Sequence, residues 1–463
     1  MFDALRKIIK DKNFLSLMGN AITAALGFMT FFVLVRSLEQ DPFGEWVLFI
    51  TAATLVDLLR FGITRVALTR FLSGANSEER KNYIGSSWLI GLMSIAIMAV
   101  LLYSLVFLFP QTIKTSGFNL FFIWYVPLAL SNLPWGNATS ILQADEEFDK
   151  ILLIRFVNTG SFLLFLVLNY YLWKVSVEWV VIWNIITNIL TSLLCSAFNW
   201  DGSKYIFHAK RETTKITLNF GKYSMGTSIG SSLLKSADSF IIGLSPFLGT
   251  TGVALYSIPI KFTEAVEIII RSFGATSFPK LSKFSIEGNI HEFRRVFYQY
   301  AGFLTYLLIP IAIVSAIFAK EFVILLGGKQ YKDVADGLAI IMQMFVIFSL
   351  LLPIDRFTGI GLDAINKPDK NFYKTLIMTS TNIVGDVIAV FLLHWLFPEL
   401  SMITILIFIS IGSIGFEIIG VLFGIYYLNK EIPLRFFTIF TEGLVVYKDL
   451  YEKALTFFKK ITT

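Results

Sequence analysis

Charged side chains lie within stretches of this sequence that are otherwise apolar. The basic ones are Arg60, Lys235, Lys261, Arg271 and Arg356. The acidic ones are Asp57, Asp238, Glu264, Glu267, Asp355, Asp386 and Glu417. Basic side chains that line a water-filled cavity could hold phosphate oxygens by charge-assisted hydrogen bonds, and a buried carboxylate could take up and release a proton. We therefore predict that all five basic residues bind an anionic substrate, with four candidates for ion coupling: Asp57, Asp238, Glu264 and Glu267.

The spacing of the charges from Lys261 to Arg271 places them on one helix face. At 100° per residue, Lys261, Glu264, Glu267 and Arg271 fall within about a third of the helix circumference. The alternative is that these charges form structural ion pairs, which spacings of three or four residues allow. We favour a functional role, because four charges on one face are more than a structural pair requires.

Other charges within the predicted helices could likewise be functional residues or structural ion pairs. Lys235 and Asp238 are three residues apart, as are Asp57 and Arg60. For Asp57 and Arg60 both interpretations stay open, since Arg60 lies near a predicted helix end and its side chain could reach the interface. The next pair, Asp355–Arg356, is adjacent in sequence and cannot share a helix face, so each residue needs a partner on another helix.

The elements that must position these residues are predicted membrane-spanning helices. The chain has 463 residues, of which 55% are hydrophobic and 16% charged, whereas soluble domains have about 25% charged residues. Apolar stretches of about 20 residues, long enough to cross a hydrocarbon core of about 30 Å, recur from end to end. The twelve predicted spans, of which the fourth and eighth are rather polar, are residues 14–35, 44–63, 84–109, 118–142, 156–173, 177–198, 223–244, 252–277, 298–319, 337–362, 375–397 and 402–428.

The loops between these spans alternate in charge. The loops on one side, together with both termini, contain 28 Lys and Arg residues, and the loops on the other side contain 6. Because Lys and Arg concentrate in cytoplasmic loops, both termini are predicted to be cytoplasmic and the number of spans to be even. The first apolar segment is longer than the core of a cleaved signal peptide, so we expect it to remain as a span.

Two polar linkers indicate an internal repeat. Residues 73–80 follow the second span and residues 285–295 follow the eighth. The alternative is a chance similarity of two cytoplasmic loops; we favour the repeat, which predicts two parallel six-helix halves with a cavity between them. The predicted fold is all-α, with lobes at residues 1–199 and 223–428, a cytoplasmic linker at 200–222 and an amphipathic tail at 429–463.

Other classes of function lack support in the sequence. Cys195 is the only cysteine and the three histidines lie far apart, so we predict no intramolecular disulfide and no metal site. We find no phosphate-binding loop with its Lys and no nucleophile–base arrangement, and we predict no catalytic residue and no organic cofactor. The net charge of +6 lies mostly in short loops, where it indicates membrane topology rather than binding of nucleic acid.

Five short pieces lie close together between Asn219 and Ser282, namely FGKYSMGT at 220–227, SAD at 236–238, IIG at 241–243, GVALY at 252–256 and FPKLS at 278–282. With these pieces the stretch resembles the Wzx-type flippases of O-antigen and exopolysaccharide, a family in the superfamily of MATE exporters and lipid II flippases. Further pieces agree in order and spacing, namely FGEW at 43–46, FGITRVALTR at 61–70, LQADEEF at 142–148 and GLDAINKP at 361–368. The resemblance thus covers nearly the whole chain.

The resemblance implies a MATE-like transporter of the bacterial inner membrane, with two six-helix lobes around a central cavity. Its substrate would be an undecaprenyl-pyrophosphate-linked oligosaccharide, flipped to the periplasmic leaflet by alternating access with H⁺ or Na⁺ coupling. Besides membrane lipids, a polysaccharide polymerase and ligase of the same pathway are its implied partners. The alternatives are a cation-coupled exporter of small molecules and an integral-membrane glycosyltransferase, for which no loop is long enough. The sugar composition, and the choice between O-antigen and another exported glycan, stay open.

Overall fold

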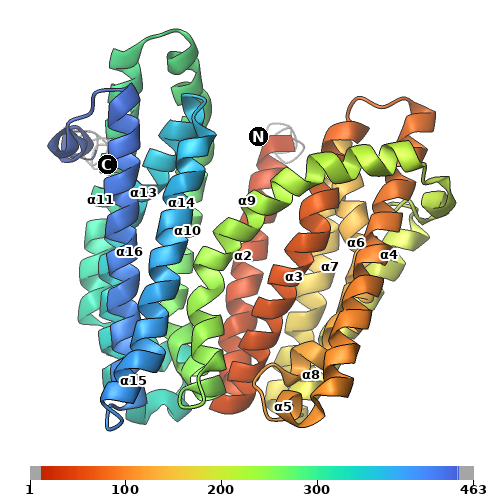
Figure 1. The fold of residues 1–463 in the computed structure, drawn as a ribbon, viewed down its shortest axis with the longest axis horizontal. Helices are drawn as coiled ribbons and strands as arrows, with labels where there is room; N and C mark the ends of the chain where they lie inside the picture. The colour runs from red at the N-terminus through yellow and green to blue at the C-terminus, as the bar shows by residue number, and fades with distance from the viewer. Residues whose placement is uncertain (1–11, 446, 448–463) are drawn as a thin grey trace, which may run out of the picture. The chain divides into compact units, whose positions relative to one another are not determined.

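The computed structural model describes residues 12–445 and 447, which are almost entirely helical (Figure 1). The long helices of the first part are α2 (Lys12–Ser37), α3 (Gln40–Leu72), α4 (Ser77–Leu108), α6 (Asn119–Ala144), α7 (Phe148–Leu168) and α8 (Val177–Ala197). Those that follow are α9 (Arg211–Leu244), α10 (Gly249–Ile286), α11 (Ile290–Ile317), α13 (Ala335–Ala364), α14 (Pro368–Val387) and α16 (Met402–Glu431). Short helical pieces join them, namely α5 (Pro110–Lys114), η1 (Asn169–Trp173), η2 (Ser203–His208), α12 (Ala319–Gly327), η3 (Lys329–Val334), η4 (Ile388–Leu392) and α15 (Leu393–Leu396).

The helices confirm the predicted all-α membrane fold, since each of the twelve predicted spans falls on one of the long helices. In the part of the chain that the structure describes, eight helices are long and apolar enough to cross a membrane. The fourth and eighth predicted spans, which correspond to α6 and α10, are not among these eight. The predicted helix ends need correction, because the second span was predicted to end at residue 63, whereas α3 continues to Leu72 and includes Arg65 and Arg70.

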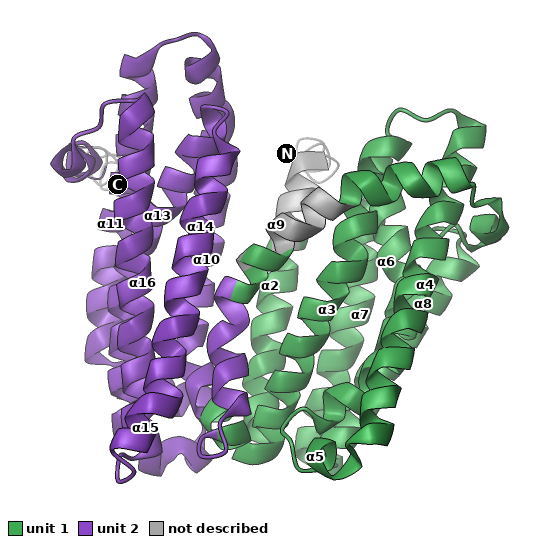
Figure 2. Ribbon diagram, in the orientation of Figure 1, with its two compact units in different colours: residues 1–233, 249–254 green, residues 234–248, 255–463 purple. Residues whose placement is uncertain are grey.

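The helices form two compact units (Figure 2). The first comprises residues 1–233 and 249–254, and the second comprises residues 234–248 and 255–463, so that α9 and α10 each contribute to both units. The lobe and linker boundaries given above from the sequence stay predictions.

In the first unit, α6 is the central helix. It packs on α3, α8 and α4, while α2 packs along α7. Asn76 caps the start of α4 by accepting hydrogen bonds from the backbone N–H groups of Glu78 and Glu79, and Glu79 returns a bond to the backbone of Asn76. This reciprocal cap fixes the residue at which α4 begins after the connection from α3.

In the second unit, α13 packs between α11 and α16, and α16 also packs on α14. Two glycines of α16 allow this close approach. A Cβ atom at Gly420 would lie 2.5 Å from the side chain of Met378, and one at Gly424 would lie 2.1 Å from Oγ1 of Thr358. These small residues let α16 lie directly against the buried polar side chains of α13 and α14 described below.

The predicted amphipathic tail, residues 429–463, starts within the last turn of α16, which ends at Glu431, and it continues in a short apolar helix, Phe436–Val445. Ile439 of this helix is fully buried, whereas Phe437 is 80% exposed, so the described part has one packed face and one open face. Gly443 meets Gly302 of α11, where a Cβ on Gly443 would lie 2.3 Å from the Gly302 backbone. Residue 446 and residues 448–463 of the predicted tail lie outside the described residues.

Candidate functional site

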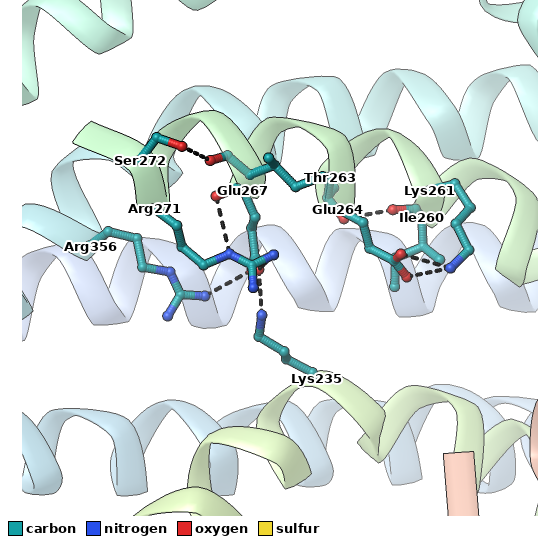
Figure 3. A network of polar contacts seen from close by, with 10 residues as sticks. Lys235, Ile260, Lys261, Thr263, Glu264, Glu267, Arg271, Ser272 and Arg356 are labelled. Carbon is teal, nitrogen blue, oxygen red and sulfur yellow. Dashed lines mark hydrogen bonds and ion pairs between the residues drawn. The ribbon is translucent and has the colours of Figure 1, made fainter. Parts of the chain in front are cut away.

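The polar stripe predicted on residues 261–271 centres on Glu267 of α10 (Figure 3). Its Oε1 accepts a hydrogen bond from Nη2 of Arg356 on α13 at 3.0 Å. Its Oε2 forms ion pairs with Lys235 of α9 and, at 3.8 Å, with Nη2 of Arg271. These four residues, which we call the Glu267 cluster, come from three helices of the second unit and combine three positive charges with one negative charge.

The opposite face of α10 fixes the direction in which this stripe points. Val266 and Ile270 are buried against Leu308 of α11 and Leu352 of α13. Because these apolar contacts anchor one face of the helix, the charged face is left away from the core. The predicted amphipathic arrangement of α10 therefore has a packing cause.

The cations of the Glu267 cluster keep open surface beside the carboxylate. The side chains of Lys235, Arg271 and Arg356 are 47%, 66% and 35% exposed, whereas that of Glu267 is 15% exposed. Charged groups at membrane depth face water or protein rather than lipid. The cluster can therefore offer several N–H donors to an anion in water.

Lys261 and Glu264 lie next along the stripe and contact each other (Figure 3). Lys261 Nζ donates to Oε1 of Glu264 at 2.8 Å and to Oε2 at 2.7 Å. This contact follows the three-residue spacing within one helix and needs no second helix. The carboxylate of Glu264 is thus already bound to a cation.

Asp57 and Arg60 belong to the first unit, in a network that joins α3 to α6. Arg60 is only 2% exposed, and it donates to the Ala129 carbonyl at 2.9 Å, to Asp57 at 2.8 Å and to Asn132 at 2.5 Å. Asp57 also accepts hydrogen bonds from Tyr125 at 3.1 Å and from Asn132 at 3.0 Å. Since both terminal nitrogens of Arg60 are bound within the protein, the geometry favours the structural interpretation of this pair.

Asp238 does not pair with Lys235, contrary to what their three-residue spacing suggested. Lys235 points to Glu267, whereas Asp238 is 5% exposed and enters the core of the second unit. There Asp238 accepts hydrogen bonds from Tyr256 at 2.5 Å, from Asn382 at 2.7 Å and from Ser413 at 3.4 Å. The amide of Asn382 also donates to Asp386 at 3.3 Å. We call these five residues the Asp238 cluster.

Two oxygen atoms of the Asp238 cluster have no hydrogen-bond partner. They are Oδ1 of Asn382 and Oδ1 of Asp386, and both residues are 1% exposed. Within the described residues, neither carboxylate of the cluster forms an ion pair with Lys or Arg. Burying two ionised carboxylates without a compensating cation is costly, so this pair is suited to take up a proton or a hard monovalent cation.

The sequence prediction missed Asp386 as a site residue although it identified it as a charge inside a span. The signal that could have found it is the four-residue spacing of Lys374, Met378, Asn382 and Asp386, which lie on one buried face of α14. Within the predicted span 375–397, the polar residues Asn382 and Asp386 at this spacing indicate an interior face. Among the described residues, no group of three or more His, Cys, Asp and Glu side chains could hold a metal ion.

Asp355 and Arg356 each have a partner on another helix, as their adjacency required. Arg356 reaches Glu267 on α10, and Asp355 binds Lys374 of α14 at 2.6 Å. Lys374 also donates to the Asp355 carbonyl and to Thr358. Lys374 lies just before the predicted span 375–397, but α14 already begins at Pro368 and buries this side chain to 4% exposure.

Lys374→Met is expected to destabilise the protein by about 3–5 kcal/mol, because it leaves Asp355 as an uncompensated charge in the core. A thermal unfolding curve in detergent would show a clearly lower Tm. The double variant Lys374→Met/Asp355→Leu should recover most of the loss, since an apolar pair can replace a buried ion pair. The control is Lys370→Met, which removes an exposed partner of Asp369 on the same helix. Equal Tm values for Lys374→Met and the wild type would contradict the role of this pair.

Comparisons with known proteins agree with this architecture. Residues 9–285 match the model of a family described as polysaccharide biosynthesis protein. No curated protein matches the chain.

Several solved structures share the fold. An inward-facing multidrug resistance MATE family transporter of the MOP superfamily has a TM-score of 0.71 at 16% identity, covering 88% of this chain and 94% of its own. The lipid II flippase MurJ in an inward closed conformation has a TM-score of 0.70 at 14% identity, covering 97% and 100%. A MOP superfamily transporter from Pyrococcus furiosus has a TM-score of 0.59 at 16% identity, covering 91% and 95%. At these identities the likeness concerns the fold alone.

Proposed function

Because the chain belongs to the polysaccharide biosynthesis protein family, we propose that it is a flippase for a lipid-linked oligosaccharide. The substrate is an undecaprenyl-pyrophosphate-linked repeat unit, moved by alternating access from the cytoplasmic to the periplasmic leaflet of a bacterial inner membrane. Both termini lie on the cytoplasmic side, in keeping with the distribution of basic residues in the loops.

The observation that carries this proposal is the Glu267 cluster. Lys235, Arg271 and Arg356 surround one carboxylate, which leaves a net charge of two positive units. A diphosphate that links a lipid to a sugar has one ionised oxygen per phosphorus, and hence two negative charges. Guanidinium groups bind such oxygens through directed, charge-assisted hydrogen bonds. The cluster therefore matches the linking diphosphate in charge and in donor chemistry.

The Asp238 cluster supports coupling to H⁺ or Na⁺. It combines two carboxylates, an amide oxygen and hydroxyl groups, and two of its oxygens lack hydrogen-bond donors. Of the four acidic residues proposed from the sequence, Asp57, Glu264 and Glu267 are each paired with a basic side chain. Of those four residues, Asp238, with Asp386 beside it, is the best-suited coupling group.

The test is flipping in proteoliposomes of a fluorescent undecaprenyl-pyrophosphate oligosaccharide. A sugar-cleaving enzyme added outside reports the fraction of substrate in the outer leaflet, with a Na⁺ or H⁺ gradient imposed in separate samples. We expect exposure well above that of protein-free liposomes, and faster with one of the gradients. Folded protein that leaves the probe inside under both gradients, but exports a small cationic dye, would instead identify an exporter of small molecules.

A further inference from the structure

We propose that Glu267 is an internal counter-anion, which occupies the place of a substrate phosphate and is displaced when the diphosphate binds. This inference rests on the proposed function, because it assigns a role within the same anion site. It gives the carboxylate a part in substrate release rather than in ion coupling.

The first ground is that the contacts of the cluster converge on one carboxylate. Arg356 donates to Oε1, while Lys235 and Arg271 pair with Oε2 (Figure 3). Carboxylate and phosphate oxygens accept hydrogen bonds from the same ionised donors with similar geometry. A diphosphate that binds these cations must therefore compete with Glu267 for their N–H groups.

The second ground is that the basic side chains stay exposed to solvent while they contact Glu267. Arg271 is 66% exposed and Lys235 is 47% exposed, so a ligand can approach them while they still touch Glu267. The contact to Arg271 is also long, at 3.8 Å. An incoming anion can thus bind the outer cations first and then exchange with the carboxylate at Arg356.

The third ground is the requirement of transport. A carrier must bind its substrate well enough to select it and weakly enough to release it. Three cations that faced a diphosphate without a competitor would hold it tightly. A carboxylate that re-forms its three contacts as the diphosphate leaves lowers the affinity and favours release.

The rival interpretation is that Glu267 only ties α9, α10 and α13 together. In that case Glu267→Gln would loosen the site and weaken binding of the diphosphate. If Glu267 is a counter-anion, the same change removes a competitor and strengthens binding. The two interpretations therefore predict changes of opposite sign.

The experiment measures equilibrium binding of undecaprenyl pyrophosphate to the purified full-length protein in detergent over a series of NaCl concentrations. We expect Glu267→Gln to bind about tenfold more tightly than the wild type at low salt, since a like charge beside the ligand is removed. We also expect a steeper salt dependence, because solution anions take the place of the carboxylate and are released on binding. In the flipping assay, the same variant should show a lower apparent KM and a lower maximal rate.

The matched control is Glu287→Gln, which removes the same charge just beyond the end of α10, where Glu287 pairs with Lys283. It should bind and flip like the wild type. If Glu267→Gln does not fold, Glu267→Ala provides the same comparison. A mono-phosphate lipid, phosphatidylglycerol, should compete poorly with the probe in both proteins.

The outcomes separate this inference from the proposed function. No salt-dependent binding by the folded wild type would overturn both. Binding and flipping by the wild type, with equal or weaker binding by the Glu267 variants, would overturn only the counter-anion role. Equal competition by phosphatidylglycerol would show that the cluster does not select a diphosphate, and would also overturn it.

Discussion

Replacing Arg356 with glutamine is expected to reduce flipping of the lipid-linked oligosaccharide about a hundredfold. Arg356 is the only member of the Glu267 cluster on α13, and its guanidinium lies 3.0 Å from Glu267. The change halves the net positive charge of the cluster and removes a planar donor that can bind two phosphate oxygens. A hydrogen bond to a charged group contributes about 1.5–3 kcal/mol, and the upper end of this range corresponds to about a hundredfold loss. The proteoliposome assay measures the rate directly.

Two further variants test whether the charge or the planar donor of Arg356 matters. Arg356→Lys keeps the charge without the planar donor, so an intermediate rate is expected. Arg356→Gln/Glu267→Gln restores the net charge of the cluster and should recover part of the lost rate. Arg295→Gln serves as the control, because Arg295 pairs with Glu292 on α11. A wild-type rate for Arg356→Gln in folded protein would show that the anion is held elsewhere.

Replacing Asp238 with asparagine is expected to remove the response of flipping to an ion gradient. Asparagine has nearly the same shape and can still accept hydrogen bonds from Tyr256 and Ser413. Its amide nitrogen would face Asn382, whose side chain can turn over and accept through the Oδ1 that has no partner in the wild type, so the packing of the core is retained. It removes one of two buried carboxylates, and with it the negative charge that would attract a proton or Na⁺. We expect the gradient-driven rate to fall about a hundredfold, on the order of the ~2–3 kcal/mol lost when a charged hydrogen-bonding group is removed.

The ion is identified by running the Asp238 experiment with Na⁺ and H⁺ gradients separately. Asp386→Asn should have the same phenotype, because Asn382 links the two carboxylates. Asp336→Asn is the control, since Asp336 is 80% exposed and pairs with Lys320. If Asp238→Asn keeps its full response to the gradient, the coupling ion binds outside the Asp238 cluster.

The helices of this protein and the charges within them can be predicted from the sequence alone. Apolar stretches of spanning length must form helices in lipid, because no water is available to satisfy the backbone polar groups there. The charged stripe on α10 follows from the helix period, since 100° per residue places residues 261, 264, 267 and 271 on one face. These features depend on neighbours in the chain, and the structure retains them in α10.

The contacts between charges on different helices could not be predicted from the sequence. Lys235 and Asp238 have the spacing of a pair, yet Lys235 binds Glu267 of α10, and Asp238 meets Asn382 of α14. Asp386 joins the same cluster from α14, where only its contact with Asn382 is local in sequence. The physical reason is that partners on different helices depend on how each helix is rotated and how closely it packs. That arrangement is set by contacts such as the approach of α16 at Gly420, which no spacing along a single helix encodes.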